Sequence, residues 1–274
     1  MKEKTYTQER MFLYCQQKMS RLASWLFLTL AIVFFYLPLV VLIIFSFNTT
    51  FFPSPWEKFT ITWYKELFAS QQLWASFYNS LIVATSASII SILMALFFLY
   101  LSIYNKHIIN WVSIFYGNLF LPEMALGACL ISYFTLFKIP LGLTTIIIAH
   151  TILGIGFSVP LLSMRFLEID PRISEASYVL GAHSMQTFLY IILPLMRPTL
   201  MATGLIIFII SFDDFVLSYF CSGNSVQTLS PFLFSSLRFG VVSPIINAFT
   251  SIVLLFSIFF TTLFFICKPK RNIF

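Results

Sequence analysis

The sequence predicts an all-α integral membrane protein with about six transmembrane helices. Hydrophobic residues make up 59% of the 274 residues, and charged residues make up only 9%. A soluble domain carries about 25% charged residues, so this chain lacks the charge to cover a globule with a wetted surface. Long apolar runs, which lack the alternation of barrel strands, occupy residues 25–47, 79–104, 111–137, 143–166, 189–211 and 245–267.

The basic residues predict how the chain is organised around the membrane. Lys and Arg collect on the cytoplasmic side, and an N-terminus on the inside places most of the 16 basic residues there. The net charge of +6 is therefore a topology signal, unlike the concentrated patch of a nucleic-acid-binding domain. The first apolar run is too long for a cleaved signal. We expect a cytoplasmic N-terminal tail, a six-helix transmembrane domain and a cytoplasmic C-terminal tail over residues 1–24, 25–267 and 268–274.

The first outer loop, residues 48–78, is rich in aromatic residues. Tryptophan and tyrosine prefer the boundary between lipid and water, so the loop predicts a short helix lying in that interface. A structural role is the plainer interpretation, and direct contact with a substrate is the alternative. The aromatic residues concerned are Trp56, Trp63, Tyr64 and Trp74.

The loop over residues 165–197 is the longest on the predicted inner side. Asp170 stands as an N-cap and Pro171 at the first helical position, where its missing N–H costs nothing. Gly181 fits a helix C-terminal stop, and a second helix then runs toward the membrane until Pro194 kinks or resets it. Such a helix–turn–helix is suited to dock into a groove on another protein. A surface helix without a partner is the alternative.

The spacing within this loop is specific. It reads Glu-Ala-Ser, three residues, Gly, nine residues, Ile, one residue and Leu-Pro, at Glu175, Ala176, Ser177, Gly181, Ile191, Leu193 and Pro194. The pattern resembles the motif of inner-membrane permease subunits of bacterial binding-protein-dependent ABC transporters, which has Ala where this chain has Ser177. The resemblance implies a coupling helix that docks on an ATP-hydrolysing subunit, and we assign Arg172 to the same contact.

The likeness covers nearly the whole chain. The stretches YLPLVVLIIFSFN, LPEMALGACLISYFTLF, SFDDFVLSYFCSG and RFGVVSPIINA are similar to the second permease subunit of spermidine/putrescine importers. The resemblance implies the type I ABC importer permease fold in a bacterial inner membrane. It also implies a homologous second permease, a dimer of ATP-binding subunits and a periplasmic or extracellular substrate-binding protein as partners. Two acidic positions of that family are occupied here by Gln227 and Ile245, which weakens a polyamine assignment or indicates a less anionic outer mouth.

A pathway for polyamine cations needs carboxylates and aromatic faces. Carboxylates are expensive inside a membrane, at about 2.5–3.5 kcal/mol for Asp at mid-span, so those present need a reason. Glu123 lies within a predicted span directly after Pro122, which suits a helix break that lines a cavity. We expect Glu123 to face the translocation path, and a protonated glutamic acid bonded to a neighbouring helix is the alternative.

Asp213 and Asp214 lie at the outer end of the fifth predicted span. Adjacent residues on a helix point about 100° apart, so at most one of the two faces the pathway squarely. The other then caps a helix or pairs with Arg238. Tyr133 and Tyr219 are the expected aromatic neighbours.

Other function classes lack their sequence signatures. No Walker lysine motif is present, so ATP and Mg²⁺ belong to a partner subunit and this chain is not the enzyme. The four cysteines and three histidines are scattered, which provides no disulfide framework, metal site or proton relay. We find no inverted repeat of a secondary transporter. The sequence therefore predicts an importer permease for polyamines. The alternatives are another small solute, such as an amino acid or inorganic ion, and a secondary transporter.

Overall fold

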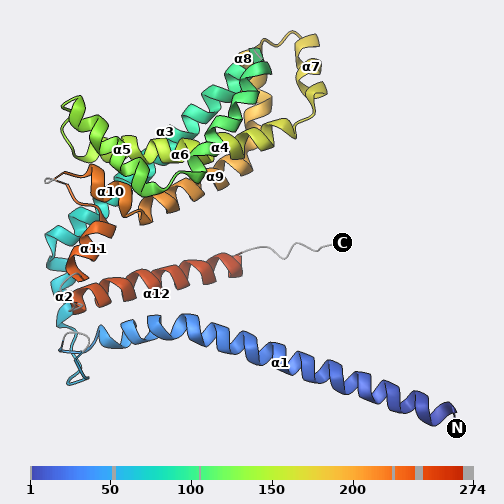
Figure 1. The fold of residues 1–274 in the computed structure, drawn as a ribbon, viewed down its shortest axis with the longest axis vertical. Helices are drawn as coiled ribbons and strands as arrows, with labels where there is room; N and C mark the ends of the chain where they lie inside the picture. The colour runs from blue at the N-terminus through green and yellow to red at the C-terminus, as the bar shows by residue number, and fades with distance from the viewer. Residues whose placement is uncertain (1, 51–53, 105, 224–225, 238–242, 268–274) are drawn as a thin grey trace. The chain divides into compact units, whose positions relative to one another are not determined.

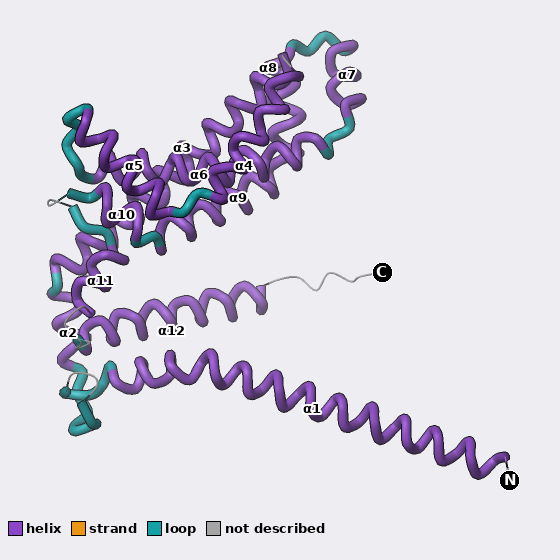
Figure 2. Tube along the Cα trace, viewed as in Figure 1, coloured by secondary structure: helices purple, strands orange, loops and turns teal. Residues whose placement is uncertain are grey.

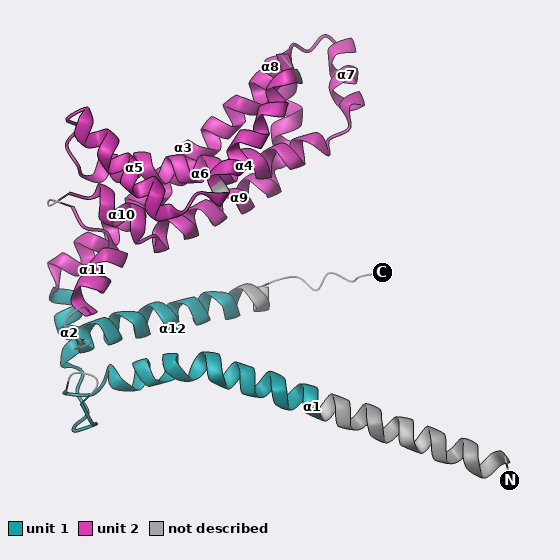
Figure 3. Cartoon of the chain, in the orientation of Figure 1, with its two compact units in different colours: residues 1–69, 239–274 teal, residues 70–238 magenta. Residues whose placement is uncertain are grey.

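The computed structural model describes residues 2–50, 54–104, 106–223, 226–237 and 243–267, without the side chains of residues 2–22, 106, 119 and 264–267. Over these ranges the chain is helical, as predicted, with one isolated β-bridge between Asn48 and Phe59 (Figure 2). The chain divides into two compact units, which are described separately below (Figure 3). Unit 1 is Met1–Ala69 with Phe239–Phe274, and unit 2 is Ser70–Arg238.

Among the described residues, 5 helices are long and apolar enough to cross a membrane, and a bent pair raises the number to 6. The predicted third span, residues 111–137, is this pair: His107–Asn118 and Glu123–Leu136 meet at 102°. The chain is therefore a multi-pass membrane protein whose predicted third span is a sharply bent pair of helices, which is either a broken span or a re-entrant loop. The continuous spans lie in α1 (Lys2–Phe45), α3 (Gln71–Tyr104), α6 (Leu143–Leu167), the segment Ser184–Asp213 and α12 (Pro244–Cys267).

Unit 1 contains α1, α2 (Thr62–Ala69) and α12, with α12 packed against both of the others. The α1 helix begins at Lys2 and therefore continues through the predicted tail. The Tyr64 hydroxyl of α2 lies 2.8 Å from the Oγ of Ser46, the residue directly after α1, and 3.3 Å from Ser251 Oγ of α12. The predicted outer-loop helix is α2, which carries Trp63 and Tyr64.

The other two aromatic residues of that loop lie outside α2. Trp56 precedes the helix, and Trp74 belongs to α3, which begins at Gln71 rather than at residue 79. The prediction placed the start of this span too late. Residues 71–78 begin with two glutamines and belong to the predicted aromatic loop, and yet they continue the same helix.

Unit 2 is built around α3, which packs against α6 and α9 (Leu193–Asp213). Small residues line the contact, which lets membrane helices approach closely. A Cβ on Gly154 of α6 would clash with Ser91 Oγ of α3. Two hydrogen bonds from hydroxyl groups also connect α3 and α6. Ser91 Oγ donates to Thr151 O at 3.1 Å, and Ser158 Oγ donates to Ser91 O at 3.0 Å.

Two regions of unit 2 lie at opposite ends of its helices (Figure 1). One end holds α7 (Pro171–Val179) and α8 (Ser184–Thr187). The other end holds α10 (Val216–Cys221) and α11 (Leu229–Leu237). The α5 helix (Glu123–Leu136) lies at this second end beside α10. Between the two ends run α3, α6, α9 and α4 (Val112–Phe120), which follows the short 3₁₀ turn Lys106–Trp111. We call the loop over residues 165–197 the docking loop. The length of the helices thus separates it from the two aspartates, Asp213 and Asp214.

Candidate functional site

The α7 helix of the docking loop begins as predicted. Asp170 is the N-cap, and its Oδ1 accepts a hydrogen bond of 2.9 Å from the backbone N–H of Arg172. Pro171 is the first helical residue. The carboxylate satisfies one of the backbone donors that every helix start leaves free. Arg172 and Glu175, both assigned to the coupling contact, are exposed on this helix.

The end of α7 is a glycine stop of the Schellman type. Gly181 adopts a φ of +88°. Its N–H donates to Tyr178 O at 3.0 Å, and Ala182 N–H donates to Ser177 O at 3.0 Å. These two bonds satisfy carbonyl groups at the helix end, and the left-handed backbone favours glycine. The predicted role of Gly181 as the helix stop is confirmed.

A buried hydroxyl pair joins α7 to α8. Ser177 Oγ lies 2.8 Å from Thr187 Oγ1, and both side chains are buried. Ser177 occupies the position where the docking motif has alanine, so the departure from the motif adds a hydrogen bond across the loop. His183 caps α8: its Nδ1 accepts from Gln186 N at 3.4 Å, and its N–H donates to Gln186 Oε1 at 3.1 Å. The docking loop is therefore held by its own polar contacts.

A π-helical turn, Phe188–Ile192, connects α8 to α9. Pro194 has no N–H, so it cannot bond to the carbonyl of Tyr190 four residues earlier. The N–H of Leu193 instead donates to the carbonyl of Phe188, five residues back. Phe188 and Ile192 are buried in the core of unit 2. The reset predicted at Pro194 is this turn, and Ile191, Leu193 and Pro194 of the motif lie in it or directly after it.

The docking loop leaves apolar side chains exposed. We call Ile173, Ala176, Val179 and Leu180 the docking surface. Val179 and Leu180 are each 88% exposed and Ile173 is 40% exposed. No described residue of unit 2 covers these side chains. Exposed apolar residues grouped on a rigid helix indicate a protein contact.

At the opposite end of unit 2, the two adjacent aspartates have different surroundings. Asp213 is the last residue of α9 and is exposed, whereas Asp214 is buried. Asp214 Oδ2 accepts a hydrogen bond of 3.0 Å from Ser218 N and lies 3.4 Å from His150 Nε2 of α6. The chain turns here because Asp214 is extended, with φ −63° and ψ 128°. The expectation that one aspartate caps a helix is met by Asp214, and Arg238 lies outside the described residues.

His150, one of the scattered histidines, is fully enclosed. Its Nδ1 lies 2.7 Å from Ser211 Oγ, and its Nε2 lies 3.2 Å from Ser218 Oγ. Nε2 therefore lies close to both Ser218 and Asp214, whose Oδ2 is 3.4 Å away. The donor and acceptor roles of the two ring nitrogens depend on the tautomer. The cluster escaped sequence analysis, although a histidine inside an apolar run was a signal for it.

The remaining candidates lie on the helices around this corner. Glu123 is the exposed first residue of α5, directly after Pro122 at the break in the third span. Tyr133 of α5 and Tyr219 of α10 are both more than half exposed. The two helices pack where Gly127 meets the ring of Phe220. The structure thus brings the elements together, while no contact joins Glu123 to either aspartate among the described side chains. Substrate roles for these residues stay predictions.

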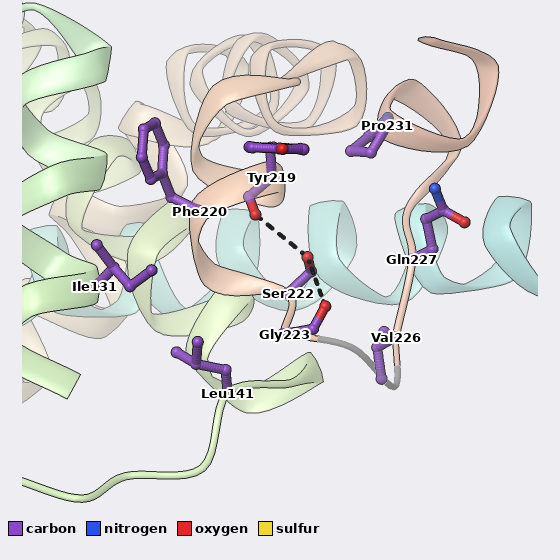
Figure 4. Close-up of a pocket in the computed structure, with 9 residues that line it drawn as sticks. All are labelled: Ile131, Leu141, Tyr219, Phe220, Ser222, Gly223, Val226, Gln227 and Pro231. Atoms are coloured by element: carbon purple, nitrogen blue, oxygen red, sulfur yellow. Dashed lines mark hydrogen bonds between the residues drawn. The ribbon is translucent and has the colours of Figure 1, made fainter. Parts of the chain in front are cut away.

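A pocket of about 640 Å³ opens among α5, α10 and α11. Figure 4 shows Tyr219 and Pro231 on one side of it and Leu141 and Val226 on the other. Ser222 Oγ donates to the carbonyl groups of Tyr219 and Gly223, each at 3.4 Å. Gln227, where the resemblance implies an acid, also lines the pocket. None of the described residues that line the pocket carries a carboxylate.

Comparison with known proteins identifies the family. The spermidine/putrescine transport system permease protein PotC of Escherichia coli K12 is 32% identical over 237 residues, which cover 85% of this chain and 88% of PotC. The chain belongs to the PotC/PotI family of transport system permease proteins. No family model matches the chain.

Other relatives agree with this assignment. The putrescine transport system permease protein PotI of the same organism is 29% identical, over 83% of this chain and 84% of PotI. A PotC homologue of Mycoplasma pneumoniae is 28% identical, over 88% of this chain and 90% of the homologue. The assignment to a permease family, predicted from the motif in the docking loop, is thus confirmed. The described part of the chain has the all-α architecture that was also predicted.

Proposed function

We propose that the chain is the membrane-spanning subunit of an ATP-driven ABC importer that carries polyamines such as spermidine and putrescine into the cytoplasm. The observation that carries this proposal is the docking loop, a capped helix with an uncovered apolar surface at one end of the transmembrane helices. The printed names of the PotC and PotI relatives support polyamines as the cargo. An amino acid or inorganic ion was the alternative cargo predicted from the sequence, since Gln227 and Ile245 stand at positions expected to be acidic, and none of these relatives favours it.

The docking surface would bind a groove on an ATP-hydrolysing partner. ATP and Mg²⁺ would be bound by that partner, which supplies the energy, and the chain itself would catalyse no reaction. A homologous second permease would complete the pathway, and a substrate-binding protein would deliver the polyamine from the outer side. In this arrangement both termini and α7 face the cytoplasm of a bacterium, in agreement with the distribution of basic residues.

The contacts between consecutive helices suggest how a movement would pass along the chain. A displacement of α7 would be passed to α8 through the 2.8 Å contact between Ser177 and Thr187. It passes through the π-helical turn into α9, which ends at Asp213. One continuous helical segment, Ser184–Asp213, therefore links the docking loop to the aspartates at the other end. A displacement of the docking loop by the ATPase would in this way change the positions of Asp213 and Asp214 through direct mechanical coupling.

The test uses the permease reconstituted in liposomes with its second permease, ATPase and binding protein. ATP hydrolysis is recorded while spermidine, putrescine, an amino-acid mixture and sulfate are added in turn. Stimulation by a polyamine alone is the expected result. Stimulation by another solute would retain the importer and discard the polyamine, whereas hydrolysis that ignores every solute and the docking variants would contradict the importer itself.

A further inference from the structure

The corner between α9 and α10 gives the two aspartates different tasks. We propose that His150 is a positioning residue that holds Asp214 inside the protein and leaves Asp213 as the single carboxylate of the pair that meets the substrate cation. This inference rests on the proposed function for the identity of the cation. The geometry that supports it concerns only the arrangement of unit 2.

The first support is that Asp214 has no freedom to turn outward. Its Oδ2 accepts from Ser218 N at 3.0 Å and lies 3.4 Å from His150 Nε2, and the side chains of His150 and Asp214 are 0% and 3% exposed. A buried carboxylate is stable only when hydrogen-bond donors surround it, and this one is supplied by the backbone of α10 and the ring of α6.

The second support is that His150 is itself fixed on both sides. Ser211 of α9 lies 2.7 Å from Nδ1, and Ser218 of α10 lies 3.2 Å from Nε2. The ring therefore touches the helix before the turn and the helix after it. A second tie anchors α10 farther along, because Thr145 Oγ1 of α6 donates to Cys221 O at 2.8 Å. The α6 helix thus holds α10 at both ends.

The third support is the contrasting state of Asp213. Its backbone is held, since Ser230 Oγ of α11 donates to its carbonyl oxygen at 3.1 Å. Its side chain is exposed, and its carboxylate forms no ion pair with a described residue. A held backbone with a free carboxylate can offer its charge to a passing ammonium group. Asp214 cannot do so without leaving its donors.

The experiment measures uptake of labelled spermidine by the complete transporter in proteoliposomes. Asp213→Asn should raise the half-saturating concentration several-fold. Asp214→Asn keeps an oxygen that can accept from Ser218 N, so it should leave the half-saturating concentration near that of the wild type. It removes the negative charge beside His150, and we expect this to lower the maximal rate. An increase in half-saturation as large for Asp214→Asn as for Asp213→Asn would overturn the proposal.

The role of His150 is tested by a double-mutant cycle. In a His150→Leu background Asp214 loses its contact with the ring and is held only by Ser218 N, so its side chain can turn outward and Asp214→Asn should now change the half-saturating concentration. His150→Gln keeps a donor near the position of Nε2 and should restore the insensitivity. If the His150→Leu protein fails to assemble, the same comparison is made with His150→Gln and His150→Asn. Equal insensitivity to Asp214→Asn in every background would contradict the positioning role.

A labelling experiment separates this inference from the proposed function. Asp213→Cys and Asp214→Cys are each made with the native cysteines replaced by serine, and a water-soluble cationic thiol reagent is applied to the assembled complex. Rapid labelling at position 213 and slow labelling at 214 is expected, whatever solute the transporter carries. Equal labelling would overturn the inference. Fast labelling at 213 that spermidine does not slow would leave the positioning intact and count against the polyamine.

Discussion

Ser177 and Thr187 share a hydrogen bond of 2.8 Å that closes the docking loop from the inside. Each hydroxyl has a further partner, since Ser177 Oγ donates to Ser174 O at 2.7 Å and Thr187 Oγ1 to His183 O at 3.3 Å. Each hydroxyl carries one proton, so one bond of this set forms at the expense of another. The loop is held by a buried polar contact in a segment whose outer surface is apolar and uncovered.

Replacing Ser177 should separate the stability of the loop from its docking. Ser177→Ala restores the residue found in the motif and removes one hydrogen bond, so it should cost about 1 kcal/mol of stability and retain uptake. Ser177→Val adds volume at a buried position and should cost about 1–3 kcal/mol through overpacking. Thermal unfolding in detergent and polyamine uptake measure the two effects. Equal uptake and equal unfolding temperature for alanine and valine would contradict the buried contact.

Gly181 offers a substitution series governed by backbone conformation. No atom lies within 4 Å of the position where a Cβ would stand, so space does not limit the side chain. The φ of +88° does. Gly181→Asn should be tolerated, since asparagine visits the left-handed region, whereas Gly181→Val should cost at least about 1–2 kcal/mol and distort the stop.

The Gly181 series is measured as ATP hydrolysis stimulated by the loaded binding protein. We expect stimulation to survive in Gly181→Asn and to fall in Gly181→Val, while both proteins insert into the membrane. Gly142→Ala is the matched control, because its surroundings are also open and its φ of 167° is ordinary extended backbone. A fully stimulated Gly181→Val would show that docking does not need the turn.

The docking loop could be predicted from sequence because its determinants are local. Asp170, Pro171 and Gly181 act on backbone groups within a few residues of themselves, and all three have the expected positions. The break at Pro122 was also foreseen as a local effect of proline. The size of the bend, 102°, was not, because it depends on how α4 and α5 pack against different neighbours.

The corner at the aspartates could be predicted only in part. The sequence predicted that Asp213 and Asp214 point apart as neighbours on a helix, whereas they diverge because α9 ends at Asp213 and Asp214 is extended. The choice between them depends on His150, whose partner Ser211 lies 61 residues away in the chain. Contacts at that separation leave no mark in one sequence. The exposed apolar surface of α7 likewise could not be told from a buried face by its periodicity alone.

Glu123 should act as a charge rather than as a structural hydrogen-bond partner. It is exposed at the start of α5, where a negative charge also favours the helix N-terminus. Glu123→Gln should raise the half-saturating polyamine concentration and change stability by less than about 1 kcal/mol. Glu168→Gln is the control for loss of a carboxylate away from the predicted pathway, since Glu168 pairs with Arg165 at 2.8 Å within the docking loop. Uptake by Glu123→Gln with an unchanged concentration dependence would assign Glu123 to a structural role.

The contact between α3 and α6 should respond sharply to volume. A Cβ on Gly154 would meet Ser91 Oγ and the side chain of Ile207, so Gly154→Ala should destabilise the permease by about 1–3 kcal/mol. Ser91→Gly should recover part of that loss in the double variant. Gly117→Ala is the control, because nothing lies within 4 Å of its Cβ position. Thermal unfolding measures the series, and indifference to Gly154→Ala would contradict the close approach.

Cys221 should be an unreactive thiol in the folded permease. It lies on α10, beyond the end of the segment Ser184–Asp213, and its side chain is buried. Burial first, and the nearby Asp214 carboxylate second, raise the pKa of the thiol from 9.0 to about 11. The thiolate is the nucleophile, so little of it exists until the pH approaches that value. A variant that keeps Cys221 and replaces the other cysteines by serine should therefore resist maleimide at neutral pH and react fully once unfolded.

The same variant reports on the corner that His150 holds. Opening this corner would expose the thiol and return its pKa toward that of a free cysteine, so His150→Leu should accelerate maleimide labelling of Cys221 at neutral pH. His150→Gln, which keeps a donor for Asp214, should accelerate it less. The measurement is the labelling rate by mass spectrometry in the assembled transporter. Identical slow rates in all three proteins would mean that packing against α6, rather than the His150–Asp214 contact, keeps α10 in place.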